Sequence, residues 1–238
     1  MQSALRLIFP PRCLGCGALV EADFALCGGC WRDAPFIAGA RCDTCGAPLP
    51  GPAGPGAEVC DDCLKIARPW QAGRAAMVYT GTARKIVLAL KHGDRTELAR
   101  PAAGWMLRAG ADVIRKDMIV APVPLHWARL LRRRYNQAAL LAQGVARGAG
   151  LCCCPDLLHR SRPTAALENA GREQRFAELA GAIRANPRRR REIAGKRFLL
   201  VDDVMTSGAT LAAASEACLA AGAAGVTVLV LARVARDV

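Results

Sequence analysis

One segment, residues 198–210, constrains the fold of this chain more than any other. It reads FLLVDDVMTSGAT, and an alanine-rich stretch follows it. A short continuous apolar run is typical of a strand that is covered on both faces of a parallel sheet. We therefore expect a strand at 197–201 that delivers Asp202 and Asp203 to its C-terminal end, and a helix that begins near Thr210.

The same segment combines two kinds of ligand group. Neighbouring carboxylates suit the 2′- and 3′-hydroxyls of a ribose, or a divalent cation bound to them. Hydroxyls and a glycine before a helix N-terminus suit a phosphate, because free N–H groups and the helix dipole favour an anion. An ordinary capped turn explains one acid but not the whole string. The pattern predicts a sugar-phosphate site beyond the end of the strand.

These residues resemble the phosphoribosyl pyrophosphate (PRPP) motif of type I phosphoribosyltransferases, which has a hydrophobic strand, two acids and a Thr/Ser-Gly loop. Other stretches resemble the ComF family, which includes the competence protein ComFC: VAPVPLH at 120–126, arginines at 129 and 132–134, and YNQA at 135–138. The resemblance spans nearly the whole chain. It implies an α/β fold, with a type I phosphoribosyltransferase-like parallel sheet flanked by helices and a small N-terminal zinc-ribbon module.

The pattern along the chain agrees with that fold class. From residue 75 onward, short apolar runs alternate with helical segments, as in a parallel α/β sheet. We expect strands at 76–79, 118–123, 198–201 and 226–232, and helices at 82–90, 97–109, 136–147 and 210–221. A change in composition near residue 70 divides the chain into a double zinc ribbon module at 1–68 and a phosphoribosyltransferase-like domain at 69–238.

The N-terminal part carries four CxxC pairs among many Gly and Pro residues. Because it has few long apolar runs, a hydrophobic core alone cannot stabilise it. Four thiolates close a tetrahedral Zn²⁺ site, and paired CxxC motifs at these separations are a strong signal for zinc. We expect two structural zinc sites made by neighbouring pairs: Cys13, Cys16, Cys27 and Cys30 in one, and Cys42, Cys45, Cys60 and Cys63 in the other.

Two alternatives to this arrangement stay open. An interleaved pairing uses the same eight ligands, and spacing does not exclude it. A thioredoxin-like redox role for each pair needs a βαβ context, which this segment lacks. The module also resembles the double zinc ribbon at the start of many ComF proteins. Sites with four thiolates leave no position for water, so they stabilise the fold and do not catalyse.

The net charge and the expected location limit the classes of molecule that this protein can bind. Lys and Arg number 33 against 20 Asp and Glu, a net charge of +13, which favours a polyanionic partner: nucleic acid first, phosphorylated small molecules second. A generally basic surface is the alternative. No apolar run approaches the ~20 residues of a membrane span, and we see no signal peptide, so we expect no membrane insertion and a cytoplasmic location. There, cysteines bind metal more readily than they form disulfides.

The resemblance implies a role for each motif residue. Asp202 and Asp203 are the catalytic pair that holds the ribose, with Mg²⁺ bridging the ribose hydroxyls and the pyrophosphate. Arginines of a 129–134 loop would stabilise the departing pyrophosphate. Lys91 has an alternative explanation, because a cation at a helix C-terminus interacts favourably with the helix dipole. Each arginine could instead belong to a basic face of a helix. The implied PRPP-binding residues are Lys91, Arg129, Arg134, Val201, Asp202, Asp203, Val204, Met205, Thr206, Ser207, Gly208, Ala209 and Thr210.

The segment at 160–180 leaves the family's pattern. Arg160–Thr164, with Arg172 and Arg175, resembles the mobile loop that closes over substrate, but the residues that follow differ from the usual ones, and Arg134 stands where a glycine commonly precedes the aromatic residue. These differences bear on catalysis, because a lid must complete the site and exclude water. We therefore keep two hypotheses: a protein that binds PRPP, and an active phosphoribosyltransferase that transfers phosphoribose to a nitrogen acceptor with release of pyrophosphate.

Each of these two hypotheses implies its own binding partners. The ComF resemblance implies competence, DNA uptake and the handling of single-stranded DNA, although aromatic residues for base stacking are sparse. DNA-uptake or recombination proteins are a further class of partner, which the zinc module would contact. PRPP or a related ribose phosphate is the expected small-molecule ligand.

Overall fold

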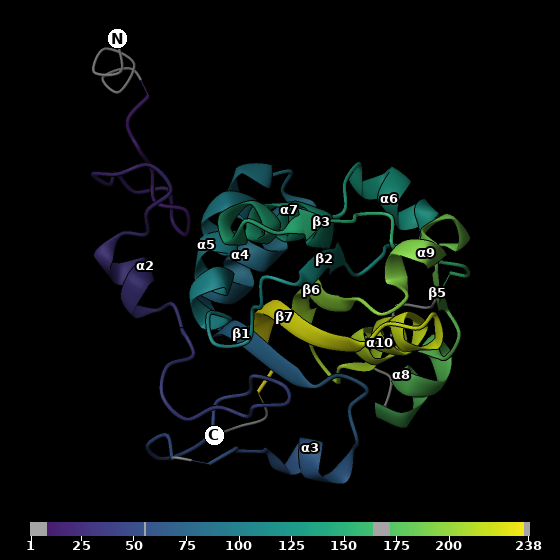
Figure 1. Cartoon of the computed structure of the whole chain (residues 1–238). Helices are drawn as coiled ribbons and strands as arrows, with labels where there is room; N and C mark the ends of the chain where they lie inside the picture. Colours follow the sequence, from purple (N-terminus) through teal and green to yellow (C-terminus); the bar gives the residue numbers. More distant parts are fainter. Residues whose placement is uncertain (1–8, 55, 164–171, 236–238) are drawn as a thin grey trace.

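The structure, a computed structural model, describes residues 9–54, 56–163 and 172–235. Within these residues, five parallel strands form one sheet in the order β1-β7-β6-β2-β3 (Figure 1). The strands are β1 (Ala72–Val78), β2 (Met118–Pro122), β3 (Cys152–Cys153), β6 (Arg197–Met205) and β7 (Gly225–Arg233). Every residue of β7 is buried. The sheet confirms the predicted fold class.

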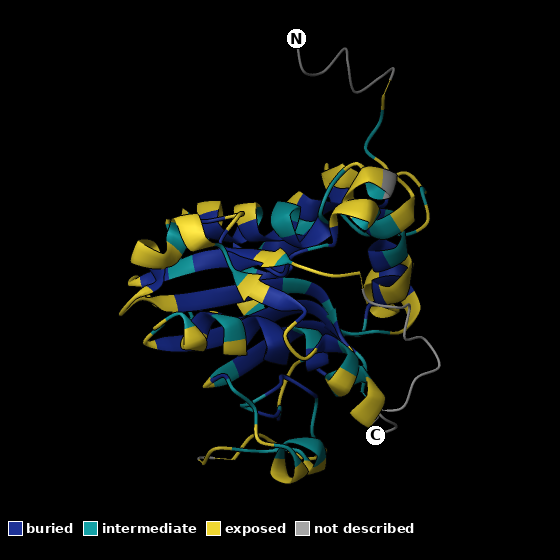
Figure 2. Ribbon diagram, turned by 90° about the vertical axis from the view of Figure 1, so that its right-hand side faces the viewer, coloured by how far each residue is buried: buried dark blue, intermediate teal, exposed yellow. Residues whose placement is uncertain are grey.

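One face of the sheet is covered by three helices that follow strands β1 and β2 in the chain. Their apolar sides bury Leu90, Met106 and Leu141 against Leu199 and Leu231 of the sheet. Figure 2 shows the buried strands between helical layers whose outer surfaces are exposed. The three helices are α4 (Gly81–His92), α5 (Ala99–Ala109) and α7 (Gln137–Ala149).

The other face is covered mainly by one alanine-rich helix. This helix, α10 (Ala209–Ala220), buries Leu211 and Cys218 against Phe198 and Leu200. A small antiparallel pair of strands and several short helices lie beside it. They are β4 (Leu158–Arg160), β5 (Ile183–Ala185), α8 (Arg172–Leu179), the 3₁₀ turn Pro187–Arg189 and α9 (Arg190–Ile193).

The cysteine-rich segment lies along the outer edge of β1. Its two short helices are α2 (Gly28–Arg32) and α3 (Asp61–Lys65) (Figure 1). Backbone hydrogen bonds join the segment to β1: Val78 N–H donates to Pro35 O at 2.9 Å, Ile37 N–H to Ala76 O at 3.0 Å, and Gly73 N–H to Asp43 O at 2.9 Å. The module therefore supplies hydrogen bonds that an edge strand otherwise lacks.

The second CxxC turn packs directly on the β1 backbone. A Cβ added to Gly46 would lie 2.5 Å from Ala75 N, and one added to Gly73 would lie 2.4 Å from Thr44 O. The buried Arg74 also joins the two parts, because its Nη2 contacts carboxylate oxygens of Asp43 at 2.8 Å and Asp112 at 2.7 Å. Only glycine permits such a close backbone approach at these two positions.

The predicted elements are present, with altered ends. β1 begins at residue 72, not 76, and the helix expected at 97–109 is a 3₁₀ turn (Thr96–Leu98) followed by α5. The strand that we expected to end at 201 continues to Met205, so the prediction that the two acids follow the strand is wrong. β7 pairs with β6 as far as Met205, and this pairing keeps the strand extended. In the described residues, no helix is long and apolar enough to cross a membrane.

Candidate functional site

The candidate site lies where the chain reverses its direction across the sheet. From β2 the chain passes through α7 to β3 on one side, whereas from β6 it passes through α10 to β7 on the other. Ligands of open α/β sheets bind at such a switch point, outside the carboxyl ends of the strands. β2 pairs with β6 only as far as Val201, and Val123 N–H makes the last bond, to Val201 O at 2.9 Å. Residues 202–205 therefore extend past β2.

The two acids of β6 lie on this extension. Asp203 is buried, and its Oδ1 lies 3.1 Å from Lys91 Nζ in the last turn of α4. Asp202 is half-buried, and its Oδ1 accepts a hydrogen bond from Asp203 N–H at 2.8 Å. Successive side chains of a strand point to opposite faces, so Asp203 points toward α4 and Asp202 toward the α10 side. The structure thus brings Lys91 to Asp203, while its role in binding PRPP stays a prediction.

Asp202 has an altered protonation equilibrium. Burial, together with the negative charge of Asp203, raises the pKa of Asp202 to about 7, although the charges of Lys91 and Arg160 act in the opposite direction. A carboxyl with such a pKa changes charge close to neutral pH. A cation beside it would favour the ionised form.

The loop after β6 forms the second half of the candidate site. Gly208 adopts φ +82° and is the N-cap of α10, where it supplies no capping side chain. Ser207 Oγ accepts from Ala209 N–H at 3.4 Å, and Thr206 is exposed. The N–H groups of the first helical turn lack intrahelical acceptors, which makes this helix start suitable for a phosphate.

Basic side chains surround the acids on the side of β4. Arg160 lies close enough to Asp202 and Arg129 that both of their charges act on its guanidinium. Burial lowers the pKa of Arg160, and the positive charge of Arg129 lowers it further, while Asp202 opposes both. Arg160 Nε is buried and has no hydrogen-bond partner among the described residues. This group has the charge and the free donor that an anionic ligand requires.

Arg160 was missed as a direct site residue by the sequence prediction, which placed it only in a closing loop. The strand that carries it, β4, is only three residues long, so the sequence showed no alternating pattern that would have predicted a strand here. Of the rest of that loop, residues 164–171 lie outside the described residues. Arg162 is placed: it pairs with Glu178 of α8, with 3.4 Å between Nη1 and Oε1. Arg172 begins α8.

The arginine-rich stretch after β2 is a helix, so the prediction of a 129–134 loop is wrong. His126 begins α6 (Trp127–Arg133), because its Nδ1 accepts from Ala128 N–H at 3.3 Å, and Arg134 ends it at φ +65°. Arg129 lies near the Arg160 side of the site, whereas Arg134 is exposed at the helix C-terminus. Its left-handed conformation is the one that glycine adopts most easily, which explains why glycine suits this position.

The motif that follows α6 fixes the loop beside the acids. Asn136 is the N-cap of α7: its Oδ1 accepts from Ala138 N–H at 3.0 Å, and its Nδ2 donates to Val123 O at 3.1 Å. Tyr135 Oη donates to Leu90 O at 2.7 Å, in the last turn of α4. Asn136 therefore both caps α7 and holds the end of β2 in place.

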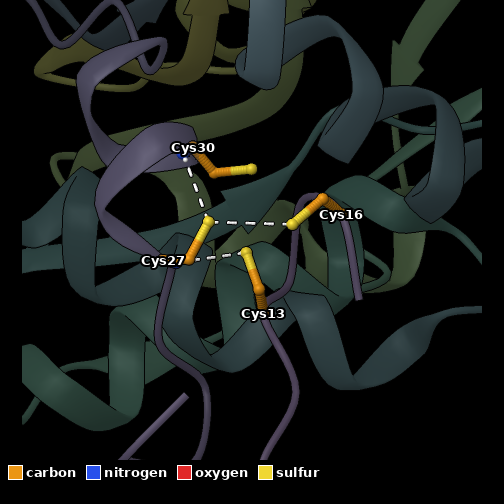
Figure 3. A group of neighbouring side chains, drawn as sticks. All are labelled: Cys13, Cys16, Cys27 and Cys30. Carbon is orange, nitrogen blue, oxygen red and sulfur yellow. Dashed lines mark hydrogen bonds between the residues drawn. The ribbon is translucent and has the colours of Figure 1, made fainter. Parts of the chain in front are cut away.

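The eight cysteines of the CxxC pairs form two groups of neighbouring pairs. Within each group, the four Sγ atoms lie within 4.8 Å of one another. The first group contains Cys13, Cys16, Cys27 and Cys30, whose side chains converge in Figure 3. The second contains Cys42, Cys45, Cys60 and Cys63. The structure therefore forms the neighbouring pairing and not the interleaved one.

The geometry of both groups fits a tetrahedral zinc ion. The distance between Sγ atoms is 3.7 Å for Cys16 and Cys27, and 3.6 Å for Cys45 and Cys60. Zn–S bonds of about 2.3 Å at tetrahedral angles require about 3.8 Å. Backbone N–H groups also point at the sulfurs, as Cys27 N–H does to Cys13 Sγ at 3.2 Å. A Cβ on Gly15 would lie 2.8 Å from Cys30 Sγ, so glycine keeps this space open.

The fold and the two kinds of site define a phosphoribosyltransferase-like α/β protein that carries a double zinc ribbon. Family models agree: residues 4–64 match the double zinc ribbon domain, and residues 136–237 match the phosphoribosyl transferase domain. The chain belongs to the ComF family, because it is 32% identical over 198 residues to the DNA utilization protein YhgH of Salmonella typhimurium, covering 81% of this chain and 83% of that protein.

Other relatives are similar over most of their length. YhgH of Escherichia coli strain K12 is 29% identical, covering 90% of this chain and 93% of that protein. Competence protein F of Haemophilus influenzae is 28% identical, covering 84% and 87%. Among solved structures, the allosteric regulatory enzyme of purine biosynthesis has a TM-score of 0.40 at 21% identity, over 60% of this chain and 30% of that one.

Proposed function

We propose that this protein binds PRPP together with Mg²⁺ at the carboxyl end of β6. One observation carries the proposal: Asp202 and Asp203, the second paired with Lys91, are followed within five residues by the Gly208 turn at the start of α10. Carboxylates suit the ribose hydroxyls, and the helix start suits the 5′-phosphate. Together the two groups therefore suit a phosphorylated ribose.

The donor set also suits the magnesium that PRPP carries. Mg²⁺ prefers oxygen ligands and is held by one or two carboxylates plus phosphate oxygens of the substrate. Asp202 and Asp203 would hold the ion through ribose or water oxygens, and the ion would neutralise the pyrophosphate. In our proposal, Val201–Thr210 contact the ribose and 5′-phosphate, while Arg129 and Arg160 bind pyrophosphate oxygens. Arg134, exposed at the end of α6, has the weakest geometric support among the proposed ligands.

Calorimetric titration of the zinc-loaded protein with PRPP tests this proposal. We expect saturable binding that needs Mg²⁺ and that the Asp202→Asn/Asp203→Asn variant weakens strongly. Asp117→Asn is the matched control. Asp117 Oδ2 lies 3.6 Å from Nη1 of Arg197, the first residue of β6, so this acid is at the end of the strand opposite to the candidate site. Unchanged affinity in the double variant would overturn the proposal.

The same arrangement would support transfer of the phosphoribosyl group. A nitrogen nucleophile would attack C1 of the ribose, the bond from C1 to the pyrophosphate oxygen would break, and pyrophosphate would leave with the bonding electrons. The pair of arginines beside Asp202 favours this step, because cationic groups stabilise the charge that develops on the leaving group. Pyrophosphate release from PRPP and Mg²⁺ with a panel of bases and amines distinguishes transfer from binding alone.

A second candidate function is the handling of single-stranded DNA. The relatives are named for DNA utilization and competence. A surface hollow of about 590 Å³ supports it, because its lining combines aromatic rings with cations at the junction of α2 and α5. Phe36 lies between Trp31, at 4.9 Å between ring centroids, and Trp105, at 5.6 Å. The cationic lining residues are Arg32, Arg41 and Arg108.

Aromatic rings with adjacent arginines are the features that bind single strands without sequence preference. Trp31 is 54% exposed, so one face is accessible to a base. We expect Trp31→Ala to weaken binding of a fluorescent single-stranded oligonucleotide in low salt, and Trp127→Ala not to, since Trp127 is exposed on α6 outside the hollow. Equal effects of both substitutions would overturn the assignment.

We propose that residues 1–68 are the zinc module and 69–238 the PRPP-binding domain, and that the protein works in the cytoplasm, where thiolates stay reduced for zinc. The zinc module would also be the surface for DNA-uptake or recombination proteins. Pull-down of such proteins with the full chain, before and after chelation of zinc, tests that role.

A further inference from the structure

We propose that the second zinc site, formed by Cys42, Cys45, Cys60 and Cys63, holds the phosphate loop in its binding conformation through two arginines, Arg68 and Arg233. This loop comprises Met205, the last residue of β6, and residues 206–208, which precede α10. This inference rests on the proposed PRPP function. It identifies the two arginines as positioning residues for that ligand.

Arg233 connects this zinc site to the first half of the loop. It ends β7, and only 3% of its surface is exposed. Its Nη1 donates to Thr206 O at 2.6 Å and to Met205 O at 3.3 Å, while Nη2 lies 3.9 Å from Cys45 Sγ. One guanidinium therefore bonds to two loop carbonyls and a cysteine sulfur.

Arg68 makes the equivalent connection to the second half of the loop. Its Nη1 donates to Ser207 O at 2.8 Å, and its side chain also hydrogen-bonds the side chain of Cys63. The guanidinium lies over the Trp70 ring at 5.5 Å and over the Phe176 ring of α8 at 5.9 Å. The two arginines thus contact three consecutive carbonyls of the loop.

The direction of these hydrogen bonds determines where the loop's N–H groups point. In a trans peptide the C=O and the following N–H point in opposite directions. Binding of the carbonyls of Met205, Thr206 and Ser207 on the zinc side therefore turns the N–H groups of Thr206, Ser207 and Gly208 away from it. Backbone N–H groups that converge in this way form an anion-binding concavity. The arginines thus orient the donors that a 5′-phosphate needs.

A bound zinc ion would hold the two arginine side chains in position, because the charges of the zinc site and of the arginines balance. Four thiolates around one Zn²⁺ carry a net charge of −2, and two guanidinium groups beside them neutralise that charge. Without zinc, the four thiolates are no longer held together beside the guanidinium groups, so the arginines lose a fixed partner. The arginines then no longer hold the loop in one orientation.

A purely structural role explains these arginines less well. The Nε atoms of both Arg68 and Arg233 are buried and, among the described residues, have no hydrogen-bond partner. An unsatisfied buried donor costs stability, which an apolar side chain at either position would avoid. What the arginines supply and an apolar residue would not is the set of bonds to the loop.

The first zinc site serves as an internal comparison. It lies against α4, where a Cβ on Gly15 would meet Thr82 Cγ2 at 3.4 Å. Among the described residues, none of its four cysteines hydrogen-bonds Arg68 or Arg233, whereas Cys45 of the second site lies 3.9 Å from Arg233 Nη2. We therefore assign the connection to the second site alone.

Amide hydrogen exchange of the full, zinc-loaded chain without ligand tests the inference. We expect Arg68→Met and Arg233→Met to increase exchange at amides 206–209 and to weaken PRPP binding by about tenfold or more. Arg74→Met is the control matched to Arg233, because Arg74 is about as buried as Arg233 and binds Asp43 and Asp112 instead of the loop. It should leave amides 206–209 protected.

The zinc arm compares Cys60→Ser with Cys16→Ser, one ligand from each site. We expect loss of one zinc in both variants, but increased exchange at 206–209 only in Cys60→Ser. If the loop stays protected in Arg68→Met and in Cys60→Ser, the inference is wrong, whatever PRPP does. If the wild-type protein does not bind PRPP while the loop responds as expected, the connection stands and the proposed ligand fails.

Discussion

Lys91 Nζ lies 3.1 Å from Asp203 Oδ1, so the last turn of α4 neutralises the buried carboxylate of the candidate site. The cation also stands at a helix C-terminus, where the helix dipole favours positive charge. The two explanations that the sequence left open for Lys91 are therefore compatible: the same side chain serves the helix end and the acid.

Loss of this ion pair should destabilise the protein. We expect Lys91→Gln to lower the free energy of unfolding at pH 8 by about 1–3 kcal/mol, because it leaves Asp203 ionised and buried without its partner. Lys85→Gln, an exposed position on the same helix, should change it by less than about 0.5 kcal/mol. Urea denaturation of both variants measures the difference, and equal changes would contradict the prediction.

Asp202 should make stability depend on pH. Its pKa in the folded protein is about 7, above its ordinary value of 3.8, so the folded state resists ionisation. Well below pH 3.8 the carboxyl is protonated in both states and contributes nothing. As pH rises toward 7, the unfolded chain ionises first, so the folded protein is progressively disfavoured, and the penalty becomes constant only well above pH 7.

Replacing Asp202 with Asn removes this penalty. We expect Asp202→Asn to raise the free energy of unfolding at pH 8 by on the order of 1–3 kcal/mol, which allows for the partial exposure of the side chain. The gain should be smaller at pH 5.5. Urea denaturation across this range, with zinc in excess, gives the difference between variant and wild type. A gain that grows as pH falls would contradict the assignment.

Docking of the second zinc turn on β1 should be sensitive to one methyl group. Gly46→Ala places a Cβ 2.5 Å from Ala75 N at φ +71°, so we expect a loss of more than about 3 kcal/mol. Gly17→Ala is the matched control: φ is +78°, and no atom lies within 4 Å of the added Cβ. It should cost only the left-handed strain, about 1–2 kcal/mol. Thermal denaturation, with zinc content measured in parallel, separates the two effects.

The C-terminus of α6 should gain stability from a glycine. Arg134 adopts φ +65°, so Arg134→Gly relieves left-handed strain and should stabilise the protein by about 1 kcal/mol. Arg134→Ala removes the same charge and keeps the strain, so it should bring no gain. If both variants have the same melting temperature, charge and not conformation determines the effect. PRPP titration of Arg134→Gly also measures whether this arginine contacts the ligand.

Local patterns were sufficient to predict part of this structure. The apolar run before Asp202 predicted a covered strand, because burial on both faces needs no information from elsewhere in the chain. The CxxC spacing predicted the eight thiol ligands, since each turn is a local structure. The length of β6 was not predictable in this way, because its last residues stay extended through pairing with β7.

The arginines of the site show where the sequence alone fails. Arg68 contacts Ser207 across 139 positions, and Arg233 contacts Cys45 across 188, so only the folded chain brings these groups together. In the sequence, only its position directly after the apolar run 226–232 marked Arg233 as unusual. The arginine run after β2 predicted a loop, although His126 caps a helix there.

The hydrogen bonds between residues 35–43 and β1 have a consequence for protein quality control. A seven-residue apolar strand at the margin of a parallel sheet is a template for pairing with other chains unless something covers it. Zinc at the two four-cysteine sites would hold this cover in place. We therefore expect the protein to self-associate through this strand when zinc is withheld.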